Sequence, residues 1–354
     1  MILVPAILLI TLGLIAVYSA SSNLAEHRLG DSYYYLKKQV LFCMIGVGLM
    51  VLTRYIPCTL YAKWVYPLLL VSVSLLALLL VPGLGHKVGG ASRWMSFGGI
   101  SFQPSELAKF SLAVYMAYSM SKKGKDMTSF SKGLLPHLFV AGVFMGLIVL
   151  QPDLGTAVII GGWILIALFV GGVRMYQLAS ILLLSSPVVV WLIWNADYRV
   201  KRVLAFLNPW EDPRGIGFQI IHSFLAFGSG GIFGAGLGNS KQKLFYLPEP
   251  HTDFALSIIG EELGLVGVSA VILLFGLLIT GGIRAALKAK DLYSTYLAVG
   301  LTSFIGLQVL INMGVVMGLL PTKGLTLPLI SYGGSSLLIT LAGIGVLLNI
   351  SARS

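Results

Sequence analysis

The chain has 354 residues, of which 57% are hydrophobic and only 10% charged, and its formal net charge is +11. Because a soluble domain carries roughly a quarter charged residues, this composition excludes an ordinary soluble protein. It indicates an integral membrane protein built from helices, since lipid offers backbone polar groups no other partners. Nothing in the sequence indicates nucleic-acid binding.

Ten apolar runs have the length and composition of membrane-spanning helices. They cover residues 1–19, 39–53, 64–81, 104–120, 134–150, 155–171, 178–194, 258–281, 294–316 and 335–350. The first run lacks a basic start and a small-residue cleavage site, so we interpret it as a retained helix and not as a signal peptide. We expect one all-α membrane domain over residues 1–354. The even number of helices and the charges of the short loops put both termini in the cytoplasm.

One long polar segment, about residues 195–257, separates the seventh and eighth predicted helices on the extracytoplasmic side. Long segments of this kind are functional or disordered, and its aromatic residues and clustered glycines argue against disorder. We interpret it as the floor and walls of a binding site.

Basic residues on the outer side run against the usual charge bias of membrane proteins. They indicate an anionic substrate such as a phosphate or pyrophosphate, although contacts with lipid headgroups and neighbouring acids would also explain them. They include Arg93, Lys109, Arg199, Lys201, Arg202, Arg214, Lys241, Lys243 and Lys323.

The fourth predicted helix begins at Pro104, in the favoured first turn, and carries two ionisable residues. Glu106 and Lys109 are three residues apart, so they share a helix face and can pair. Ionisable groups at membrane depth usually face a cavity or a partner. The pair therefore either anchors the helix or lines a substrate cavity.

Three short motifs have more than one interpretation or mark a predicted helix start. Asp153 in QPDLGT is expected to cap the following helix. The glycine-rich stretch 228–238 either cradles a phosphate or permits close packing. Ser331 or Ser335 is expected to cap the last helix, whose first N–H groups would suit an anion.

The isolated Gln308 and Asn312 are expected to hold helices together rather than to bind substrate.

The sharpest chemical feature is EPHTDF at residues 249–254, where the long segment re-enters the membrane. Its Asp253 is flanked by His251 and Thr252. Burial at such a boundary raises the pKa of a carboxyl group, which makes it a better base near neutral pH. The alternative is that Asp253 caps the next helix.

Eight blocks, in order along nearly the whole chain, resemble the shape, elongation, division and sporulation (SEDS) family of membrane proteins. They are VYSASS (17–22), SRWMSFGGISFQPSELAK (92–109), QPDLGT (151–156), YRVKRVLAFLNPW (198–210), GIGFQIIHS (215–223), GSGGIFGAGLGNSKQK (228–243), LPEPHTDFALSIIGEELG (247–264) and LPLISYGGSS (327–336). The stretches 242–254 and 320–336 look more like the division branch of the family than the elongation branch.

The resemblance implies a ten-helix enzyme that polymerises lipid II into peptidoglycan strands at the outer face of the bacterial cytoplasmic membrane. The essential aspartate of the family corresponds to Asp253, its Arg-Trp position to Arg93 and Trp94, and its Glu and Lys to Glu106 and Lys109. The same blocks and the stretch 320–336 hold further candidate substrate-binding residues: Arg199, Arg202, Gln219, Lys243, His251, Thr252, Lys323, Ser331 and Ser335.

The resemblance also implies partners. These are lipid II, a polyprenyl-pyrophosphate-linked glycan, a class B penicillin-binding protein and other membrane proteins of the division septum. A divalent cation, Mg²⁺ or Mn²⁺, would assist the departing diphosphate, but the sequence identifies no metal ligands. The alternatives are a lipid II flippase, an elongation-type polymerase and a scaffold that only recruits a partner.

Overall fold

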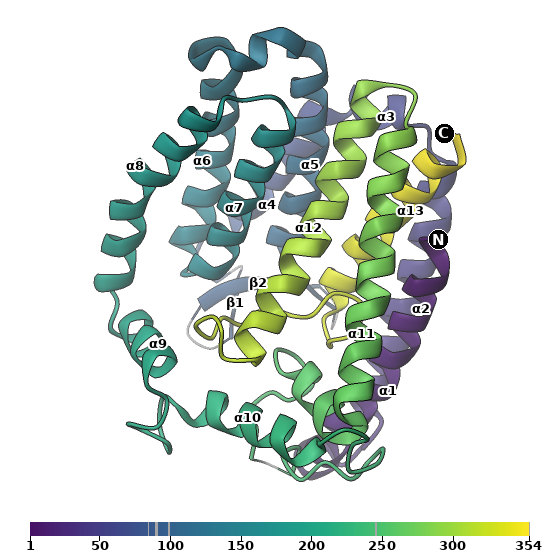
Figure 1. The fold of residues 1–354 in the computed structure, drawn as a ribbon, viewed down its shortest axis with the longest axis vertical. Helices are drawn as coiled ribbons and strands as arrows, with labels where there is room; N and C mark the ends of the chain where they lie inside the picture. Colours follow the sequence, from purple (N-terminus) through teal and green to yellow (C-terminus); the bar gives the residue numbers. More distant parts are fainter. Residues whose placement is uncertain (84, 89–90, 98–99, 245, 354) are drawn as a thin grey trace.

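The computed structural model describes residues 1–83, 85–88, 91–97, 100–244 and 246–353 (Figure 1). The fold is mostly helical. Its α-helices are α1 (Leu3–Leu29), α2 (Tyr34–Tyr55), α3 (Cys58–Lys63), α4 (Val65–Leu78), α5 (Pro104–Lys123), α6 (Leu135–Leu150), α7 (Leu154–Val170), α8 (Met175–Trp194), α9 (Asp197–Leu207), α10 (Phe218–Gly230), α11 (Ala255–Lys288), α12 (Leu292–Val316) and α13 (Gly334–Arg353). A 3₁₀ turn (Gly124–Thr128) and a π-helical turn (Phe130–Leu134) connect α5 to α6.

In the described part of the chain, seven helices are long and apolar enough to cross a membrane. They are α1, α2, α6 with its preceding turn, α8, α11, α12 and α13. Two of the other predicted segments, α4 and α7, are apolar but shorter. The remaining one, α5, carries Glu106 and Lys109 near its start. Helices thus occupy every predicted segment, while length and composition identify seven of them as spans.

The centre of the bundle is formed by α12 and α13, which are largely buried. Small residues allow close approach here. Thr53 of α2 donates its hydroxyl to the carbonyl of Ala342 at 3.0 Å, and a Cβ at Gly345 would overlap the backbone of Met50. Trp163 of α7 stacks on Phe304 of α12 with ring centroids 3.9 Å apart. This packing gives a rigid base for the loops at one end.

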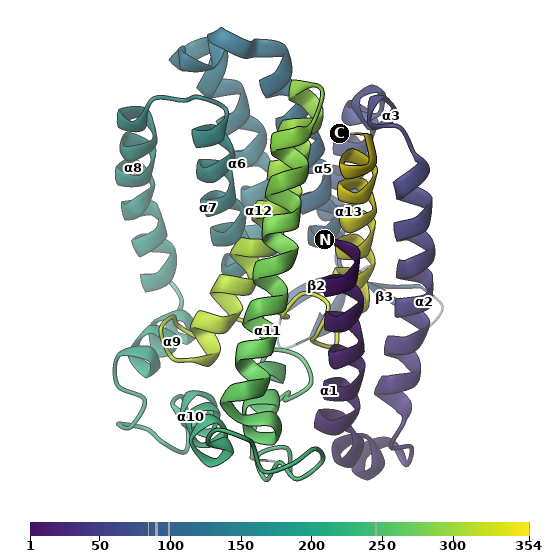
Figure 2. The same ribbon diagram turned by 45° about the vertical axis from the view of Figure 1, so that its right-hand side comes forward.

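That end carries α9, α10 and the long segment before α11, which lie together below the bundle in Figures 1 and 2. The opposite end carries the α5–α6 connection. Both terminal helices are held by neighbouring elements. Arg284, near the end of α11, contacts Met1. Asn349 of α13 donates its side-chain N–H to the carbonyl of Ile56, just after α2.

Two expectations need correction. The fold is not purely α, because three short antiparallel strands, β1 (His86–Val88), β2 (Ala91–Phe97) and β3 (Ile100–Phe102), lie between α4 and α5. The long polar segment is not a plain loop either, because it forms α9 and α10. α9 has a strong polar face, and α10 is apolar but only 13 residues long, so neither reads as an apolar run of membrane-spanning length.

The glycine-rich stretch supports packing, as one of its two interpretations predicted. α11 has a kink at Gly264, whose φ is +64°, and a Cβ there would overlap the backbone of Gly234. The N–H groups of Ala235 and Gly236 donate to the carbonyls of Glu261 and Glu262 at 2.9 and 3.0 Å. The stretch therefore satisfies carbonyls at the kink.

Candidate active site

A cavity of about 190 Å³ lies between the ends of α7 and α8, α9 and the segment 321–325. Four cations from three parts of the chain line it: Arg93 of β2, Arg199 and Arg202 of α9, and Lys323. Asp153 is the one acidic residue among the described residues that line it. The cavity is therefore strongly cationic.

Two of these arginines are held by backbone carbonyls. Arg93 donates to the carbonyl of Pro152, and its Nε lies 3.8 Å from Asp153 Oδ2. Arg199 donates to the carbonyl of Leu192 at 2.6 Å, which ties α9 to the end of α8. Both guanidinium groups are thus oriented before a ligand arrives.

The other two cations are less constrained. Arg202 Nη1 lies 3.5 Å from the carbonyl of Thr322. Burial lowers the pKa of Lys323, and the charge of Asp153 opposes this effect. No carboxylate in the described ranges forms an ion pair with Arg202 or Lys323. Their charge is available to an anion in the cavity.

Asp253 lies directly beside this cavity. A Cβ placed on Gly324, a lining residue, would lie 3.3 Å from Asp253 Oδ2. Asn312 of α12 holds the two segments together, because its Nδ2 donates to the carbonyls of Asp253 at 3.1 Å and Leu325 at 2.6 Å. The expectation that Asn312 holds helices together is met only in part, because it joins α12 to two segments that lie outside the helices.

The pKa of Asp253 is raised to about 7, first by burial and then by the charge of Glu249. Arg202 and Arg93 oppose the shift, which means that both cations lie close enough to influence the carboxyl group. The residue at the cap of α11 is Phe254. The alternative interpretation of Asp253 as this cap is therefore wrong.

His251 and Thr252 shape the segment that carries Asp253. The His251 ring is buried, 4.5 Å from the ring of Tyr35 and 5.6 Å from that of Tyr332, and burial lowers its pKa to about 4. Thr252 donates its hydroxyl to the carbonyl of Glu249 at 3.1 Å. Near neutral pH His251 is therefore uncharged, and Asp253 is the group of this segment that titrates there.

The predicted Glu106–Lys109 pair is confirmed. Lys109 Nζ lies 2.8 Å from Glu106 and 3.0 Å from Gln308 Oε1. Gln308 in turn donates to the carbonyl of Thr326 at 3.0 Å, so it connects α5 to the segment before α13, as its predicted role required. The pair lines a separate cavity of about 40 Å³.

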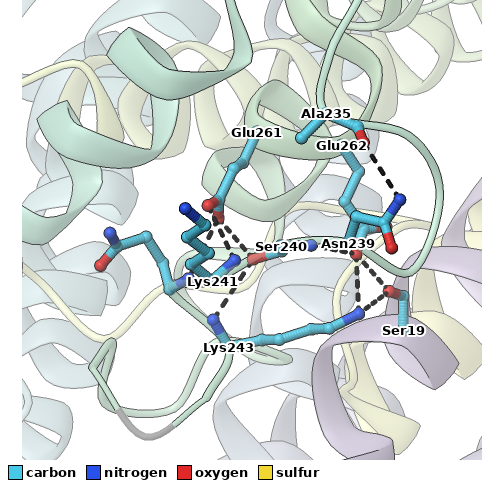
Figure 3. A network of polar contacts seen from close by, with 9 residues as sticks. Ser19, Ala235, Asn239, Ser240, Lys241, Lys243, Glu261 and Glu262 are labelled. Atoms are coloured by element: carbon cyan, nitrogen blue, oxygen red, sulfur yellow. Dashed lines mark hydrogen bonds and ion pairs between the residues drawn. The ribbon is translucent and has the colours of Figure 1, made fainter.

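Lys243 lies in a different, buried network (Figure 3). Its Nζ is 2.9 Å from Glu262 Oε1 and 2.9 Å from the hydroxyl of Ser19. The adjacent Glu261 accepts the backbone N–H of Lys241 at 2.9 Å. The charge of Lys243 is thus compensated inside the protein, which joins α1, α11 and the segment 239–243.

The remaining candidates have varied positions. Trp94 lies on β2 next to Arg93, half-buried, and Gln219 lies on α10 in the wall of another cavity. The expectation that Ser331 or Ser335 caps α13 is wrong. Ser335 lies inside the helix and accepts the N–H of Gln103 at 2.9 Å, while the Ser331 hydroxyl accepts the N–H of Leu327 at 2.9 Å.

Sequence reasoning missed two contributors to this site. Asp153 caps α7, as predicted, by accepting the N–H of Thr156 at 3.2 Å, but it also contacts Arg93 in the cavity. Gly324 brings the segment 321–325 against Asp253, and the only signal was the Pro- and Gly-broken character of that segment. Among the described residues, no three or more His, Cys, Asp or Glu side chains gather as a metal site.

Fold and site together define a multi-pass membrane protein with a cationic cavity beside a carboxyl group that titrates near neutral pH. The model of the cell cycle protein family of FtsW, RodA and SpoVE matches residues 1–354. The chain therefore belongs to this family, which is the SEDS family that the sequence blocks resemble.

Relatives and solved structures agree with this membership. The chain is 47% identical over 352 residues to the probable peptidoglycan glycosyltransferase FtsW of Geobacter metallireducens, covering 99% of this chain and 94% of that protein. It is 45% identical over 354 residues to the stage V sporulation protein E of Bacillus subtilis, covering 100% and 97%.

Among solved structures, a chain from a peptidoglycan synthase complex that coordinates polymerization and crosslinking superposes with a TM-score of 0.78 at 33% identity, covering 96% of both chains. The rod shape determining protein RodA of Thermus thermophilus superposes with a TM-score of 0.73 at 28% identity, covering 99% of this chain and 96% of that one.

Proposed function

We propose that this chain is a peptidoglycan glycosyltransferase that polymerises lipid II, with Asp253 as its general base. The observation that carries the proposal is the raised pKa of Asp253, about 7, beside a cavity lined by four cations. A base with such a pKa is partly ionised at neutral pH and accepts a proton readily. The names of the relatives support the same reaction.

The reaction joins the 4-hydroxyl oxygen of the acceptor GlcNAc to the anomeric carbon of a glycan linked to a polyprenyl diphosphate. As that bond forms, the bond from the anomeric carbon to the diphosphate oxygen breaks. Its electron pair leaves with the diphosphate, and the hydroxyl proton goes to Asp253. A single displacement inverts the α-linkage to β-1,4, as in other inverting sugar chemistry.

The cations stabilise the charge that develops on the leaving diphosphate. Charged donors oriented beforehand in a site of low dielectric constant stabilise such charge strongly. Arg93 and Arg199 are held by backbone carbonyls, while Arg202 and Lys323 have no carboxylate partner in the described ranges. The apolar side chains of Val158, Val189 and Ile193 line the same cavity and would contact the start of the polyprenyl tail.

The expected Mg²⁺ or Mn²⁺ stays a prediction. Mg²⁺ is usually held by one or two carboxylates together with substrate phosphates and water. Asp153, the acidic residue in the described wall of the cavity, is the carboxylate available for that mode of binding, and the diphosphate would supply further oxygens. When bound, the ion would add positive charge at the leaving group.

We place ten helices across the membrane, with both termini in the cytoplasm and the segment 195–257 outside. Seven apolar spans support this topology, and α4, α5 and α7 are counted because they pack within the same bundle. The division septum is the proposed location, because several similar proteins are named FtsW. A class B penicillin-binding protein is the proposed partner, since a similar chain belongs to a complex that also crosslinks.

The test is Asp253→Asn in the purified full-length protein with its partner in liposomes. Loss of the base should lower the rate of glycan formation by about 10²–10⁴-fold while lipid II binding and the melting temperature persist. Asp126→Asn, in the turn after α5, is the matched control and should polymerise normally. A near-normal rate for Asp253→Asn would exclude Asp253 as the base. Lipid translocation without glycan product would favour the flippase alternative.

A further inference from the structure

A second cavity, of about 340 Å³, lies between α9, the start of α10 and the segment before α11. Lys201, Arg202 and Arg214 line it together with Gln219. No Asp or Glu occurs among the described residues of its wall. A volume above about 300 Å³ is typical of ligand sites.

The positive charge of this cavity is not neutralised by the protein. In the described ranges, no carboxylate forms an ion pair with Lys201, Arg202 or Arg214. The nearby Asp212 instead accepts the backbone N–H groups of Gly215 and Ile216 at 3.0 and 3.2 Å, which fixes the cavity wall. A cleft lined by one sign of charge attracts ligands of the opposite sign.

The two cavities are neighbours and share part of their walls. Tyr198, Arg202 and Thr322 line both of them. The segment that carries Asp253 also connects them, because its Pro248 lines the second cavity and Asp253 lies against the first. Because the cavities share these wall residues, a ligand whose diphosphate occupies the first cavity can extend into the second.

The linings of the two cavities differ in chemistry. The first includes apolar faces of α7 and α8, which suit a lipid tail. The second is formed by loop and short-helix residues, with Tyr198 and Phe218 beside basic groups and an amide. Aromatic faces next to hydrogen-bonding groups suit sugar rings, and free carboxylates pair with Lys and Arg.

We propose that the second cavity binds the disaccharide-peptide portion of peptidoglycan. Lys201 and Arg214 pair with carboxylates of the peptide, and Gln219 bonds to polar groups of the sugars. The proposal rests on the proposed polymerase function and adds a site for the water-soluble part of its substrate. The same chemistry occurs in the growing strand and in the headgroup of incoming lipid II.

The experiment compares the full-length wild type with the double variant Lys201→Gln/Arg214→Gln, in liposomes with the partner present. Both side chains are exposed, so the double variant should melt at the wild-type temperature. Lys241→Gln is the control, because Lys241 is exposed and lies outside the wall of this cavity. The measurements are strand length, the rate of lipid II consumption and KM for lipid II.

If the growing strand occupies the cavity, the double variant makes strands several-fold shorter at an unchanged rate of consumption. If the lipid II headgroup occupies it, KM rises about tenfold, which corresponds to 1.4 kcal/mol of binding. Strand length and KM both equal to those of Lys241→Gln would overturn the proposal. An equal loss of rate in Lys201→Gln/Arg214→Gln and in the control Lys241→Gln would also overturn the proposal.

A failure of the proposed polymerase function can be distinguished from a failure of the second cavity as a binding site. If the wild type makes no glycan under any condition, the polymerase function fails, and the cavity is then judged by binding alone. Soluble, lipid-free disaccharide-pentapeptide should bind the wild type and the Lys241→Gln variant equally, and the double variant about tenfold more weakly. Equal binding by all three proteins would overturn the site independently of turnover.

Discussion

The carboxylate of Asp253 lies so close to Gly324 that a Cβ on that residue would be 3.3 Å from Oδ2. This distance is tighter than an ordinary van der Waals contact. If Asp253 is the base, as we propose, glycine at this position leaves space in front of it for the substrate hydroxyl. The contact connects the segment before α11 to the segment after α12, far apart in the sequence.

Gly324→Ala should therefore slow catalysis several-fold, and Gly324→Val should slow it by about 10²-fold, since displacement of a catalytic group by about 1 Å has effects of that size. The expected change is in kcat, because the four cations that we propose to bind the diphosphate are not altered. The measurement is steady-state glycan synthesis from lipid II.

Gly276→Ala is the control for that series. Gly276 lies on α11, and a Cβ added there would meet no atom of the described residues within 4 Å, while alanine favours the helix. This variant should polymerise at the wild-type rate. A Gly324→Val protein as fast as Gly276→Ala would show that the space beside Asp253 is not used by the substrate.

The pH dependence follows from the pKa of Asp253, about 7. As the proposed base, Asp253 acts when it is ionised, so kcat/KM should rise with pH and level off above pH 7, with about a tenth of the maximal rate one unit below the pKa. His251 does not cause this rising limb of the pH profile, since its pKa lies near 4. Initial rates between pH 5 and pH 9 measure the profile.

Glu249→Gln tests whether the rising limb of the pH profile belongs to Asp253. The charge of Glu249 raises the pKa of Asp253, so its removal should shift the limb to lower pH. Glu211→Gln makes the same charge change at an exposed residue of the loop before α10 and should leave the limb in place. Equal profiles for both variants would assign the limb to another group.

The sequence was sufficient to predict features that depend on local pattern. Apolar length predicted the positions of the helices, and the spacing of Glu106 and Lys109 predicted their pairing. Asp153 was recognised as a cap from its place before α7. Asp253 was singled out because a carboxylate stands where a polar segment meets an apolar run, but local pattern left a base and a helix cap as alternatives, and its proposed role as the base came from the resemblance to the SEDS family.

Features that depend on distant contacts could not be predicted. Lys243 was expected to bind substrate, yet its partners are Glu262 and Ser19, the latter 224 residues away. The contact of Arg93 with Asp153 likewise joins β2 to the start of α7. Residue type and charge in a sequence do not reveal which cations are already neutralised by the fold.

Lys109 gives a further prediction, since its side chain is buried with Glu106 and Gln308. Lys109→Ala leaves the Glu106 carboxylate without its cation, which should destabilise the protein by about 3–5 kcal/mol. In the double variant Glu106→Leu/Lys109→Met the melting temperature should recover. If Lys109 also binds substrate, as the resemblance to the SEDS family implies, KM for lipid II stays raised in this double variant.

A double variant with normal KM would restrict Lys109 to a structural role. The comparison needs both thermal unfolding and kinetics, because loss of folded protein alone lowers the apparent rate. Lys63→Ala, on the α3 turn at the opposite end of the bundle, should change neither quantity and serves as the charge-matched control.

The buried pair of Lys243 and Glu262 should contribute to stability but not to substrate binding. Lys243→Met leaves the Glu262 carboxylate, whose side chain is 3% exposed, without a cation. This change should destabilise the protein by about 3–5 kcal/mol. The double variant Lys243→Met/Glu262→Leu removes both charges and should regain most of that stability. Because the pair lies outside the cavities that contain the proposed substrate sites, kcat and KM of the purified double variant should match the wild type. A raised KM despite a normal melting temperature would restore Lys243 to the substrate-binding residues.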